Sequence, residues 1–490
     1  MNSVVGGFQK NAKTLVNAYR AALDEGAECV VSPLGSLVGY PIGGLGYKAH
    51  FIAQSRAVLE EMAKEIGEVP LVVGVLEERE GLFSHCIAIL YRREVLLQGG
   101  EHRELGCLSR HDPTQEFWGA PSMLLWEFQE RKLGFVMGDH LFKSSDIIHE
   151  TQKVDVLICL TAMPYLRDLD KDAEECVRVL AKTSQKNVIF CNAVGGSDDR
   201  VCKGESLAVS SSGDLLVKGE AFAEQTIVVD PTHVVNLPVR RGGMETLYEV
   251  LVLGVRDFVC KSGFRHISLG FNGDINSIVM AMVAREALGN ERVKLYATTQ
   301  DVLNEGGRLR GLLREAGLDQ LSLSDAALAS KEECLQGLFT ETLQQQITAL
   351  RLIQLSESSG QLLLSTVDKS DLMLGGYGHL THVKGSFAPL GDLYSTLVEE
   401  LAGWIFRKGS YESEREYEAQ DRVLKLLIER HWSADKIVQD KGFEESFVRG
   451  IQRKIDRNRR FSMQMPLVLK VHEKSVREKL IVPIGQRYQG

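Results

Sequence analysis

The segment KSGFRHISLGFNGDINSIVMAMVAREALG, residues Lys261–Gly289, decides the fold of the second half of this chain. Within it, Ile267–Phe271 is a short apolar run, which predicts a buried strand. A glycine-containing turn follows, and Ser277–Leu288 predicts a helix. A strand, a glycine turn and a helix in this order begin a parallel sheet. We therefore expect a parallel-sheet α/β domain in the second half.

The first 230 residues show a different arrangement, in which helices alternate with short apolar strands and end in hairpins. A helix is predicted over Asn11–Glu25 and strands over Leu71–Val75 and Asn187–Asn192. The segment PTHVVNLPVRRGG, 231–243, is polar, contains two prolines and ends in a glycine pair, as linkers do. We therefore expect one domain over 1–230, a linker over 231–243 and a second domain over 244–490.

Length and charge limit the classes of function. A chain of 490 residues is too long for one hydrophobic core, so two domains are the natural expectation. The net charge of −9 argues against a broad surface for nucleic acid or anionic membrane. The one basic run, 449–460, fits a solvated helix face with Ile451 and Ile455 buried.

Cysteine usage bears on the compartment. The nine cysteines are odd in number and form no CxxC pair, which indicates reduced thiols rather than a disulfide framework. The first residues lack the apolar core of a signal peptide, and no uncharged apolar run is long enough to span a bilayer. We therefore expect a cytoplasmic protein that does not span a membrane.

Several segments resemble one known family. GAECVVSPLGSLVGYP, Gly26–Pro41, resembles the nitrilase-type glutaminase segment G-A-x-L-V-V-F-P-E-x-x-L-x-G-Y-P. Lys261–Gly289 resembles the pyrophosphatase-loop segment of NAD synthetases, whose core reads S-G-G-x-D-S. STVDKSD, 365–371, resembles T-T-G-N-K-S-E. Further matches occur in the family's order in VDVLICLTAMPY (154–165), FCNAVGGSDDRVCKGES (190–206) and ETLQQQ (341–346).

The ordered set of matches covers nearly the whole chain and resembles the glutamine-dependent NAD synthetase family. This resemblance implies an α/β protein with an N-terminal nitrilase-like αββα sandwich and a C-terminal parallel-sheet domain of the adenine-nucleotide (pyrophosphatase-loop) hydrolase-like type. It also implies an activity. A working member hydrolyses glutamine in the first domain and passes ammonia to the second, which adenylates deamido-NAD with ATP and Mg²⁺ and then amidates it.

The residues at the glutaminase positions do not suit this chemistry. Amide hydrolysis in this family needs a Glu base, a Lys and a Cys nucleophile. Pro33 is followed by Leu34 in place of the Glu, and Gly138 in the segment VMGDH takes the cysteine position. The Lys segment aligns poorly, which leaves His102 or Arg103 as replacements.

Two other thiols and the start of the chain bear on the same domain. Cys159 lies in a strand that matches a different part of the family pattern, so we interpret it as a buried structural cysteine. Cys107 lacks a recognisable base, and a lone thiol is more often inert. Met1-Asn2 corresponds to the end of the family's first strand. Either the start is displaced or the sandwich is built without that strand.

The pyrophosphatase loop is also altered and reads NGDINS. Asn272 replaces the first Ser, Asp274 the second Gly and Asn276 the metal-binding Asp, whereas Gly273 and Ser277 are kept. A carboxylate at Asp274 repels pyrophosphate, and the amide of Asn276 lacks the charge that Mg²⁺ prefers. One hypothesis is a loop retuned for another ligand, such as a cation or a neutral base. The other, which we favour, is a loop kept as a helix cap.

Further positions of the synthetase domain point the same way. Gln346 replaces an Arg, His382 replaces an Asp, and Asp371 replaces the Glu of N-K-S-E, whereas Lys369 and Ser370 survive. The family's proline-rich substrate loop is shortened to KGSYESEREYEAQDRV, 408–423. The spacing of His379, His382 and Cys334 is not that of a metal site, so we expect none.

We therefore expect a catalytically inactive, NAD synthetase-like pseudoenzyme. Such a protein serves as a large homo-oligomer, filament or scaffold, or as a regulatory partner of an authentic NAD synthetase. The alternative is an active or residual ATP-dependent ligase of altered specificity. ATP, Mg²⁺ and NAD stay open as ligands. The vestigial nucleotide-binding positions are Asn272, Gly273, Asp274, Asn276, Ser277, Lys369 and Ser370.

Overall fold

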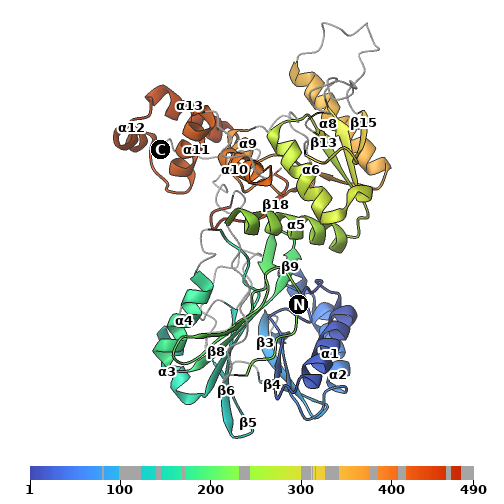
Figure 1. Ribbon diagram of the computed structural model, residues 1–490, viewed down its shortest axis with the longest axis vertical. Helices are drawn as coiled ribbons and strands as arrows, with labels where there is room; N and C mark the ends of the chain where they lie inside the picture. Colours follow the sequence, from blue (N-terminus) through green and yellow to red (C-terminus); the bar gives the residue numbers. More distant parts are fainter. Residues whose placement is uncertain are drawn as a thin grey trace. The chain divides into compact units, whose positions relative to one another are not determined.

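The computed structural model (Figure 1) divides into two compact units, Met1–Ser197 with Val201–Arg240 and Asp198–Arg200 with Arg241–Gly490. The expected linker, 231–243, lies outside the described residues except for its last glycine. The structure describes residues 1–79, 82–98, 123–138, 145–167, 172–230, 243–298, 311, 313–314, 316–325, 341–375, 385–406, 415–458 and 465–475.

The first unit contains a four-stranded sheet in the order β1-β2-β3-β4, a six-stranded sheet in the order β12-β11-β8-β7-β6-β5, and the two-stranded pair β10-β9. Its elements are α1 (Phe8–Asp24), β1 (Val30–Val31), η1 (Gly43–Tyr47), α2 (Ala49–Ala63), β2 (Leu71–Arg79), β3 (Leu82–Tyr91), β4 (Glu94–Gln98), β5 (Leu124–Phe128), β6 (Arg131–Met137), α3 (Ser145–Glu150), η3 (Thr151–Lys153), β7 (Val156–Thr161), α4 (Asp172–Ser184), β8 (Asn187–Asn192), β9 (Val194–Ser197), β10 (Arg200–Lys203), β11 (Leu207–Val209) and β12 (Leu215–Lys218).

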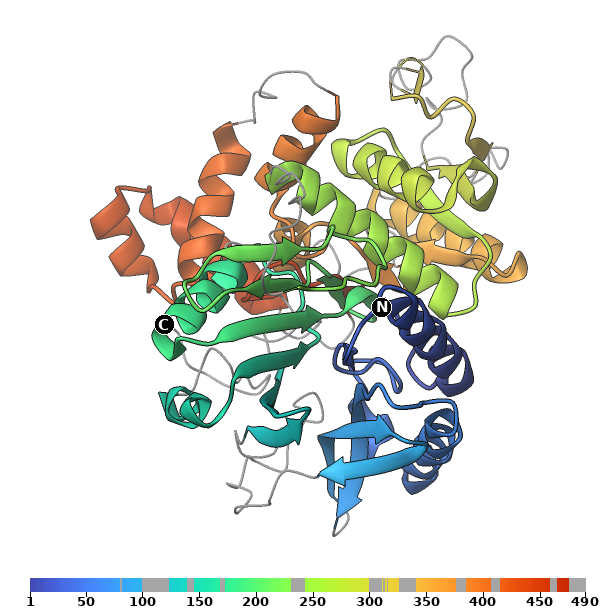
Figure 2. The same cartoon turned by 60° about the horizontal axis from the view of Figure 1, so that its bottom comes forward.

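Strand β7 shows how the sequence builds four layers in this unit. Ile158 and Leu160 join the apolar core between the two sheets, whereas Leu157 and Cys159 join the core on the side of α3 and α4. Successive side chains of a strand alternate between its faces, so an uninterrupted apolar strand is buried on both. Helices α1 and α2 cover the outer face of the other sheet (Figure 1). The expected nitrilase-like αββα sandwich is confirmed, and Figure 2 shows its green strands side by side.

The second unit is built on a six-stranded sheet in the order β15-β14-β13-β16-β17-β18. All of its strand pairs are parallel, which confirms the expected parallel-sheet α/β fold. Its elements are α5 (Gly243–Lys261), β13 (Ile267–Phe271), α6 (Ile275–Leu288), η4 (Asn290–Arg292), β14 (Val293–Ala297), β15 (Ser322–Asp325), α8 (Glu341–Ser358), β16 (Leu362–Leu364), α9 (Lys369–Leu374), β17 (Phe387–Ala388), α10 (Ser395–Ile405), α11 (Arg415–Ile428), α12 (Ala434–Lys441), α13 (Glu445–Asn458) and β18 (Leu467–Val468).

The altered loop follows β13, and the order in which the chain adds strands to the sheet reverses at this strand. The chain runs from β13 to β14 on one side, and it later returns to β16 on the other side of β13. Ligands of open parallel sheets bind outside the carboxyl ends of the strands at such a switch point. The loop after β13 and the segment after β16 therefore meet at the edge where this fold class places its ligands.

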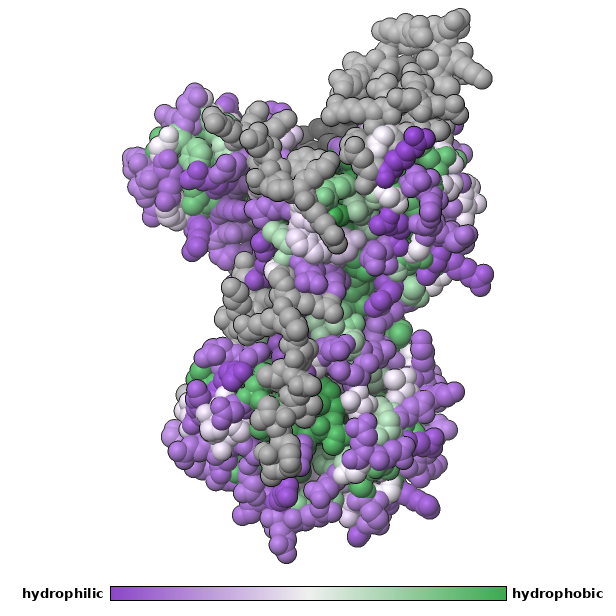
Figure 3. Space-filling model, in the orientation of Figure 1, coloured by the Kyte–Doolittle hydropathy of each residue, from purple (hydrophilic) through white to green (hydrophobic). Residues whose placement is uncertain are grey.

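Helices α9, α11, α12 and α13 share one apolar core in the second unit. In α13, Ile451 and Ile455 are buried in this core, whereas Arg453, Lys454 and Arg457 are exposed. Figure 3 shows hydrophilic residues, in purple, around a smaller hydrophobic patch, in green, where α12 and α13 lie. The expectation of a solvated basic face over two buried isoleucines is confirmed for the described part of the run.

Candidate functional site

Leu34 and the neighbourhood of Gly138 meet in the first unit, as the resemblance implies. Leu34 is buried, with 1% of its surface exposed, in a cluster with Ala162 and Cys202. Met137, the last residue of β6, packs against this cluster, and Gly138 follows it directly. The structure therefore places the two altered glutaminase positions on adjoining elements.

This arrangement offers little chemistry for amide hydrolysis at the two family positions. Leu34 is an apolar side chain that moves no proton, and Gly138 has no side chain. Gly138 has a φ of 67°, in the left-handed region where a side chain is strained. Cys202, from β10, is buried beside Leu34, a neighbour that sequence reasoning did not single out. Its thiol gains no base from Leu34.

Burial raises the pKa of three other thiols of this unit. It raises the pKa of the Cys29 thiol to about 12 and that of Cys191 to about 11. Burial also raises the pKa of Cys159, which has no exposed surface. These thiols stay protonated near neutral pH, and the thiolate is the nucleophile in cysteine chemistry. The interpretation of Cys159 as a buried structural cysteine is confirmed.

The loop after β13 uses its own side chains to close on itself. Asp274 is the N-cap of α6, and its Oδ1 accepts the backbone N–H of Ser277 at 2.7 Å. Its Oδ2 accepts the Asn272 amide at 2.7 Å, and Asn272 Oδ1 in turn accepts the backbone N–H of Asp274 at 3.2 Å. Gly273 has a φ of 81°, which favours glycine at this position. Because the cap extends the helix, α6 begins at Ile275, two residues before the predicted start.

These bonds bear directly on phosphate binding. Free backbone N–H groups at a helix N-terminus form an anion site, and the helix dipole assists them. In this loop the N–H groups of Asp274 and Ser277 already donate to side chains of the loop. The carboxylate of Asp274 thus stands where an anion would receive its first hydrogen bonds.

Asn276 connects the first turn of α6 to the segment after β16. Its Nδ2 donates to Asp368 Oδ2 at 3.1 Å and to Asp371 Oδ2 at 3.5 Å. Asp368 and Asp371 also form a capping box at the start of α9. Ser395, the first residue of α10, donates its hydroxyl to Asp368 Oδ2 at 2.7 Å. Three helices therefore meet on two carboxyl groups, of which Asp368 is buried and Asp371 is half-buried.

The environment of these carboxyl groups favours their protonated forms. Burial raises the pKa of Asp368 to about 7, and the Asp371 carboxylate adds to the increase, while hydrogen bonds from Ser395 and Asn276 oppose it. Burial likewise raises the pKa of Asp371 to about 6, helped by the charges of Asp274 and Asp421. Sequence reasoning had no signal for Asp421, although Asp368 departs visibly from the Asn of N-K-S-E.

Lys369 lies in an internal ionic network. Its side chain has no exposed surface, and its Nζ lies 3.3 Å from both Asp392 Oδ1 and Glu429 Oε1. It also donates to the carbonyl of Lys474 at 2.9 Å and lies 4.7 Å from the centre of the Tyr394 ring. The ammonium group is therefore fully surrounded by protein partners.

The partners of Lys369 are themselves tied to the C-terminal segment. Asp392 Oδ2 accepts the backbone N–H groups of Val471 and His472 at 2.9 and 2.8 Å. Burial alone would raise the pKa of Asp392, but His472 and Lys369 hold it below its usual range. Ser370, the second surviving residue of the motif, donates to Asp421 Oδ1 at 2.6 Å. Both surviving residues thus serve contacts within this unit.

Within the described ranges, no group of three or more His, Cys, Asp or Glu side chains is arranged to hold a metal ion. Gln346 lies half-buried on α8. Several residues discussed from the sequence lie outside the described residues: His102, Arg103, Cys107, Cys334, His379 and His382.

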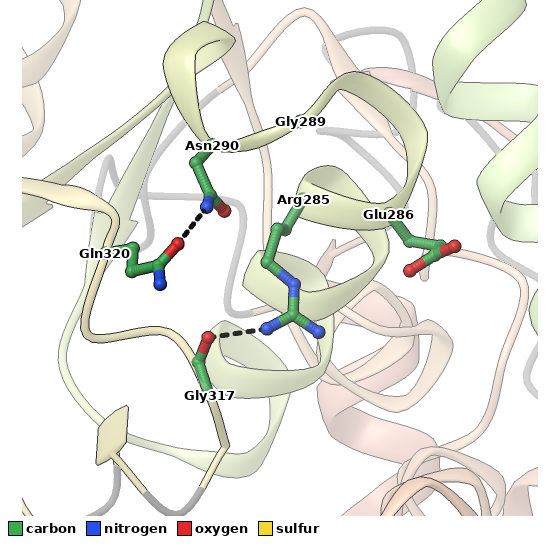
Figure 4. Close-up of a pocket in the computed structure, with 6 residues that line it drawn as sticks. All are labelled: Arg285, Glu286, Gly289, Asn290, Gly317 and Gln320. Atoms are coloured by element: carbon green, nitrogen blue, oxygen red, sulfur yellow. Dashed lines mark hydrogen bonds between the residues drawn. The ribbon is translucent and has the colours of Figure 1, made fainter.

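A separate open pocket of about 550 Å³ lies near the opposite end of α6 (Figure 4). Arg285 Nη1 points to the carbonyl of Gly317 and donates to it at 2.6 Å. Asn290 donates to Gln320 at 2.7 Å. The pocket is lined by Arg285, Glu286, Gly289, Asn290, Gly317 and Gln320. These bonds cross-link the two sides of the pocket.

Comparison with known proteins assigns both halves of the chain. The carbon-nitrogen hydrolase family model matches residues 1–233, and the NAD synthase family model matches residues 247–406. The glutamine-dependent NAD(+) synthetase of Thermotoga maritima is 25% identical over an alignment of 576 positions, gaps included, which covers 100% of this chain and 98% of that protein. The chain belongs to the glutamine-dependent NAD synthetase family.

Other members of the NAD synthetase family match this chain over nearly their whole length and share its fold. The glutamine-dependent NAD(+) synthetase of Synechocystis sp. is 24% identical, with 100% of this chain and 98% of that protein covered. The solved Acinetobacter baumannii enzyme in complex with ADP has a TM-score of 0.73 at 23% identity and covers 99% of this chain and 97% of its own. The Cytophaga hutchinsonii structure has a TM-score of 0.77 at 13% identity, covering 99% and 96%. These two structures support the fold.

The match to the NAD synthase model includes β13, the altered loop and α6. Among the helices that the structure describes, none is long and apolar enough to cross a membrane.

Proposed function

We propose that this member of the NAD synthetase family is non-catalytic and acts as an oligomeric scaffold, a filament subunit or a regulatory binding protein. The observation that carries the proposal is the closed loop after β13. Asp274 and Asn272 accept the backbone N–H groups of Ser277 and Asp274 with their own side chains. A nucleotide phosphate would have to displace a carboxylate that is already hydrogen-bonded, and it would meet the same negative charge.

The residues present do not fit ATP with magnesium. Asn276 turns amide hydrogens towards Asp368 and Asp371, and hydrogens repel a cation. Lys369, the surviving cation of the N-K-S-E segment, is held between Asp392 and Glu429. The groups that would neutralise phosphate charge are therefore engaged elsewhere.

The glutaminase half supports the same proposal independently. Leu34 fills the base position as part of an apolar cluster, and Gly138 supplies no nucleophile. A chain that had lost only the glutaminase site would suit an ammonia-dependent enzyme. Alterations at both the glutaminase and the synthetase site favour a binding role. The preserved αββα and parallel-sheet skeletons are what such a role requires.

A second candidate is an ATP-dependent ligase of altered specificity. It is favoured by the position of the loop at the switch point of the parallel sheet and by the retention of Gly273 and Ser277. This candidate requires Asp274 to leave its cap when the ligand binds.

Two measurements on the full-length protein separate the candidates. The first is NAD formation from deamido-NAD with ATP–Mg²⁺ and either glutamine or ammonia, with the Thermotoga maritima enzyme as positive control. The second is thermal unfolding with each ligand titrated alone. A ligand at 100 times its Kd stabilises the folded state by about 2.7 kcal/mol, which is readily measured. We expect no NAD and no shift. Turnover contradicts the proposal, and a nucleotide shift without turnover favours a regulatory binding protein over a scaffold.

The assembly part of the proposal has its own test. Size-exclusion chromatography with light scattering measures the mass of the particle, and electron microscopy reveals a filament. Mixing with an authentic NAD synthetase then asks whether the two coassemble and whether its rate changes. A monomer that leaves the authentic enzyme unaffected contradicts both the scaffold and the regulatory role.

A further inference from the structure

Two departures from the family motifs face each other in space. The loop carries Asn276 where the motif S-G-G-x-D-S has Asp, and the segment STVDKSD carries Asp368 where T-T-G-N-K-S-E has Asn. Taken alone, each change is a lost residue. Taken together, they exchange an amide and a carboxylate between two positions whose side chains lie 3.1 Å apart.

Asp368, the carboxyl half of the exchanged pair, is buried, and hydrogen-bond donors surround it, whereas Asn276 is half-buried. Asp368 is 2% exposed. Its Oδ1 accepts the backbone N–H of Asp371 at 2.8 Å, and its Oδ2 accepts both Ser395 Oγ at 2.7 Å and Asn276 Nδ2. Asn276 Nδ2 also reaches Asp371 Oδ2 at 3.5 Å. A buried carboxylate is costly unless such donors surround it.

The donor set at this junction does not suit a divalent cation. Magnesium requires oxygen ligands with open lone pairs in octahedral geometry. Here the lone pairs of Asp368 already accept three hydrogen bonds, and the central position is filled by the N–H groups of Asn276. The remaining carboxylate of the loop, on Asp274, caps α6.

We propose that Asn276, Asp368 and Asp371 form an amide clamp that replaces a metal ion as the tie between α6, α9 and α10. The amide hydrogens of Asn276 take the place of the cation, because they put partial positive charge between the carboxyl groups of Asp368 and Asp371. The clamp continues to α11, since Asp421 accepts Ser370 Oγ at 2.6 Å and the backbone N–H of Thr396 at 2.9 Å. The junction is therefore closed without nucleotide or metal.

The clamp deepens the proposed function and rests on it, because a scaffold benefits from one ligand-independent arrangement. Its test is nevertheless independent of catalysis. The midpoint of thermal unfolding of the full-length protein is measured in MgCl₂ and in EDTA for the natural chain, Asn276→Asp, Asp368→Asn and the double exchange. Asn290→Asp, which adds the same charge at the far end of α6, is the matched control.

We expect the natural chain to have the same midpoint in MgCl₂ and EDTA. Asn276→Asp sets a third carboxylate against Asp368 and Asp371, so its midpoint in EDTA falls well below that of Asn290→Asp, and magnesium recovers part of the loss. The double exchange restores an amide–carboxylate pair in reversed order. Its midpoint therefore lies above the value obtained by adding the shifts of the two single variants.

Two results overturn the clamp. One is a natural chain that magnesium stabilises as much as Asn276→Asp, which would mean that a cation site is present. The other is a double exchange whose shift equals the sum of the single shifts, which would mean that the two residues do not act as a pair. NAD formation by the natural chain would instead contradict the proposed function and would leave these stability results in place.

Discussion

Replacing Asp274 tests whether its side chain occupies the anion position of the loop. Asp274→Ala removes the carboxylate that accepts the N–H of Ser277 at 2.7 Å, and with it the N-cap of α6. Loss of an Asp cap to Ala costs about 1 kcal/mol, whereas replacement by Gly costs only a few tenths. In a unit of this size, 1 kcal/mol shifts the unfolding midpoint by about 2–4 °C. We therefore expect a fall of about 3 °C for Asp274→Ala and of about 1 °C or less for Asp274→Gly.

The same two variants free the backbone N–H of Ser277, so both should gain affinity for an anion. Inorganic pyrophosphate is the probe, titrated during thermal unfolding of the second unit. At ten times its Kd it would add about 1.4 kcal/mol, a rise of roughly 3–6 °C. Asp274→Asn is the matched control, because it removes the charge but keeps a side-chain acceptor on the same N–H. We expect no pyrophosphate shift for it or for the natural chain.

This control separates occupancy from charge. Pyrophosphate could raise the unfolding midpoint of Asp274→Asn as much as that of Asp274→Gly. In that case the charge of the carboxylate excludes the anion, and the hydrogen bond on the Ser277 N–H does not. If pyrophosphate stabilises the natural chain as strongly as Asp274→Gly, the closed loop does not exclude anions, and the reasoning behind the non-catalytic proposal fails.

Three further predictions follow from burial. Lys369→Met should lower the free energy of unfolding by about 3–5 kcal/mol in chemical denaturation, because it leaves Asp392 buried without its cation; an effect below 1 kcal/mol would contradict the network. Leu34→Ala should cost about 2–5 kcal/mol in the same assay, since Leu34 is 1% exposed; a loss typical of a surface change would mean that the cluster around it is loose. The last concerns pH: the pKa of Asp368 is raised to about 7, so the folded state holds the proton more tightly than the unfolded state. The proton on Asp368 therefore stabilises the folded state in acid, and this stabilisation is lost as the pH rises through 7. The difference in stability between the natural chain and Asp368→Asn should change across that range, and a constant difference would refute the assignment.

Sequence pattern alone determined the architecture because its signals are local. The strand over Ile267–Phe271, the glycine turn and the helix after it were predictable from about 25 consecutive residues, and the structure has them with a helix start two residues earlier. Strand β8 also has the predicted bounds, Asn187–Asn192. By contrast, β17 and β18 are two residues long, and only their pairing in the ladder defines them. Such short strands leave no periodic pattern to read.

The altered positions were likewise visible in the sequence, but their consequences were not. Leu34, Gly138 and Asp274 departed from the family motifs as single letters. That Asp274 accepts the N–H of Ser277 three residues away was predictable as a helix cap, because a cap is a local interaction.

Only the tertiary structure decided what surrounds the surviving and exchanged residues. Asn276 meets Asp368 across 92 positions of sequence, and Lys369 meets Glu429 and Lys474 across 60 and 105. The first of these contacts arises because parallel strands bring the loops after β13 and β16 to one edge of the sheet. No pattern within either segment encodes which distant side chain will lie opposite. The packing of the C-terminal segment therefore decides whether the Lys369 ammonium can bind a phosphate or is engaged in contacts within the fold.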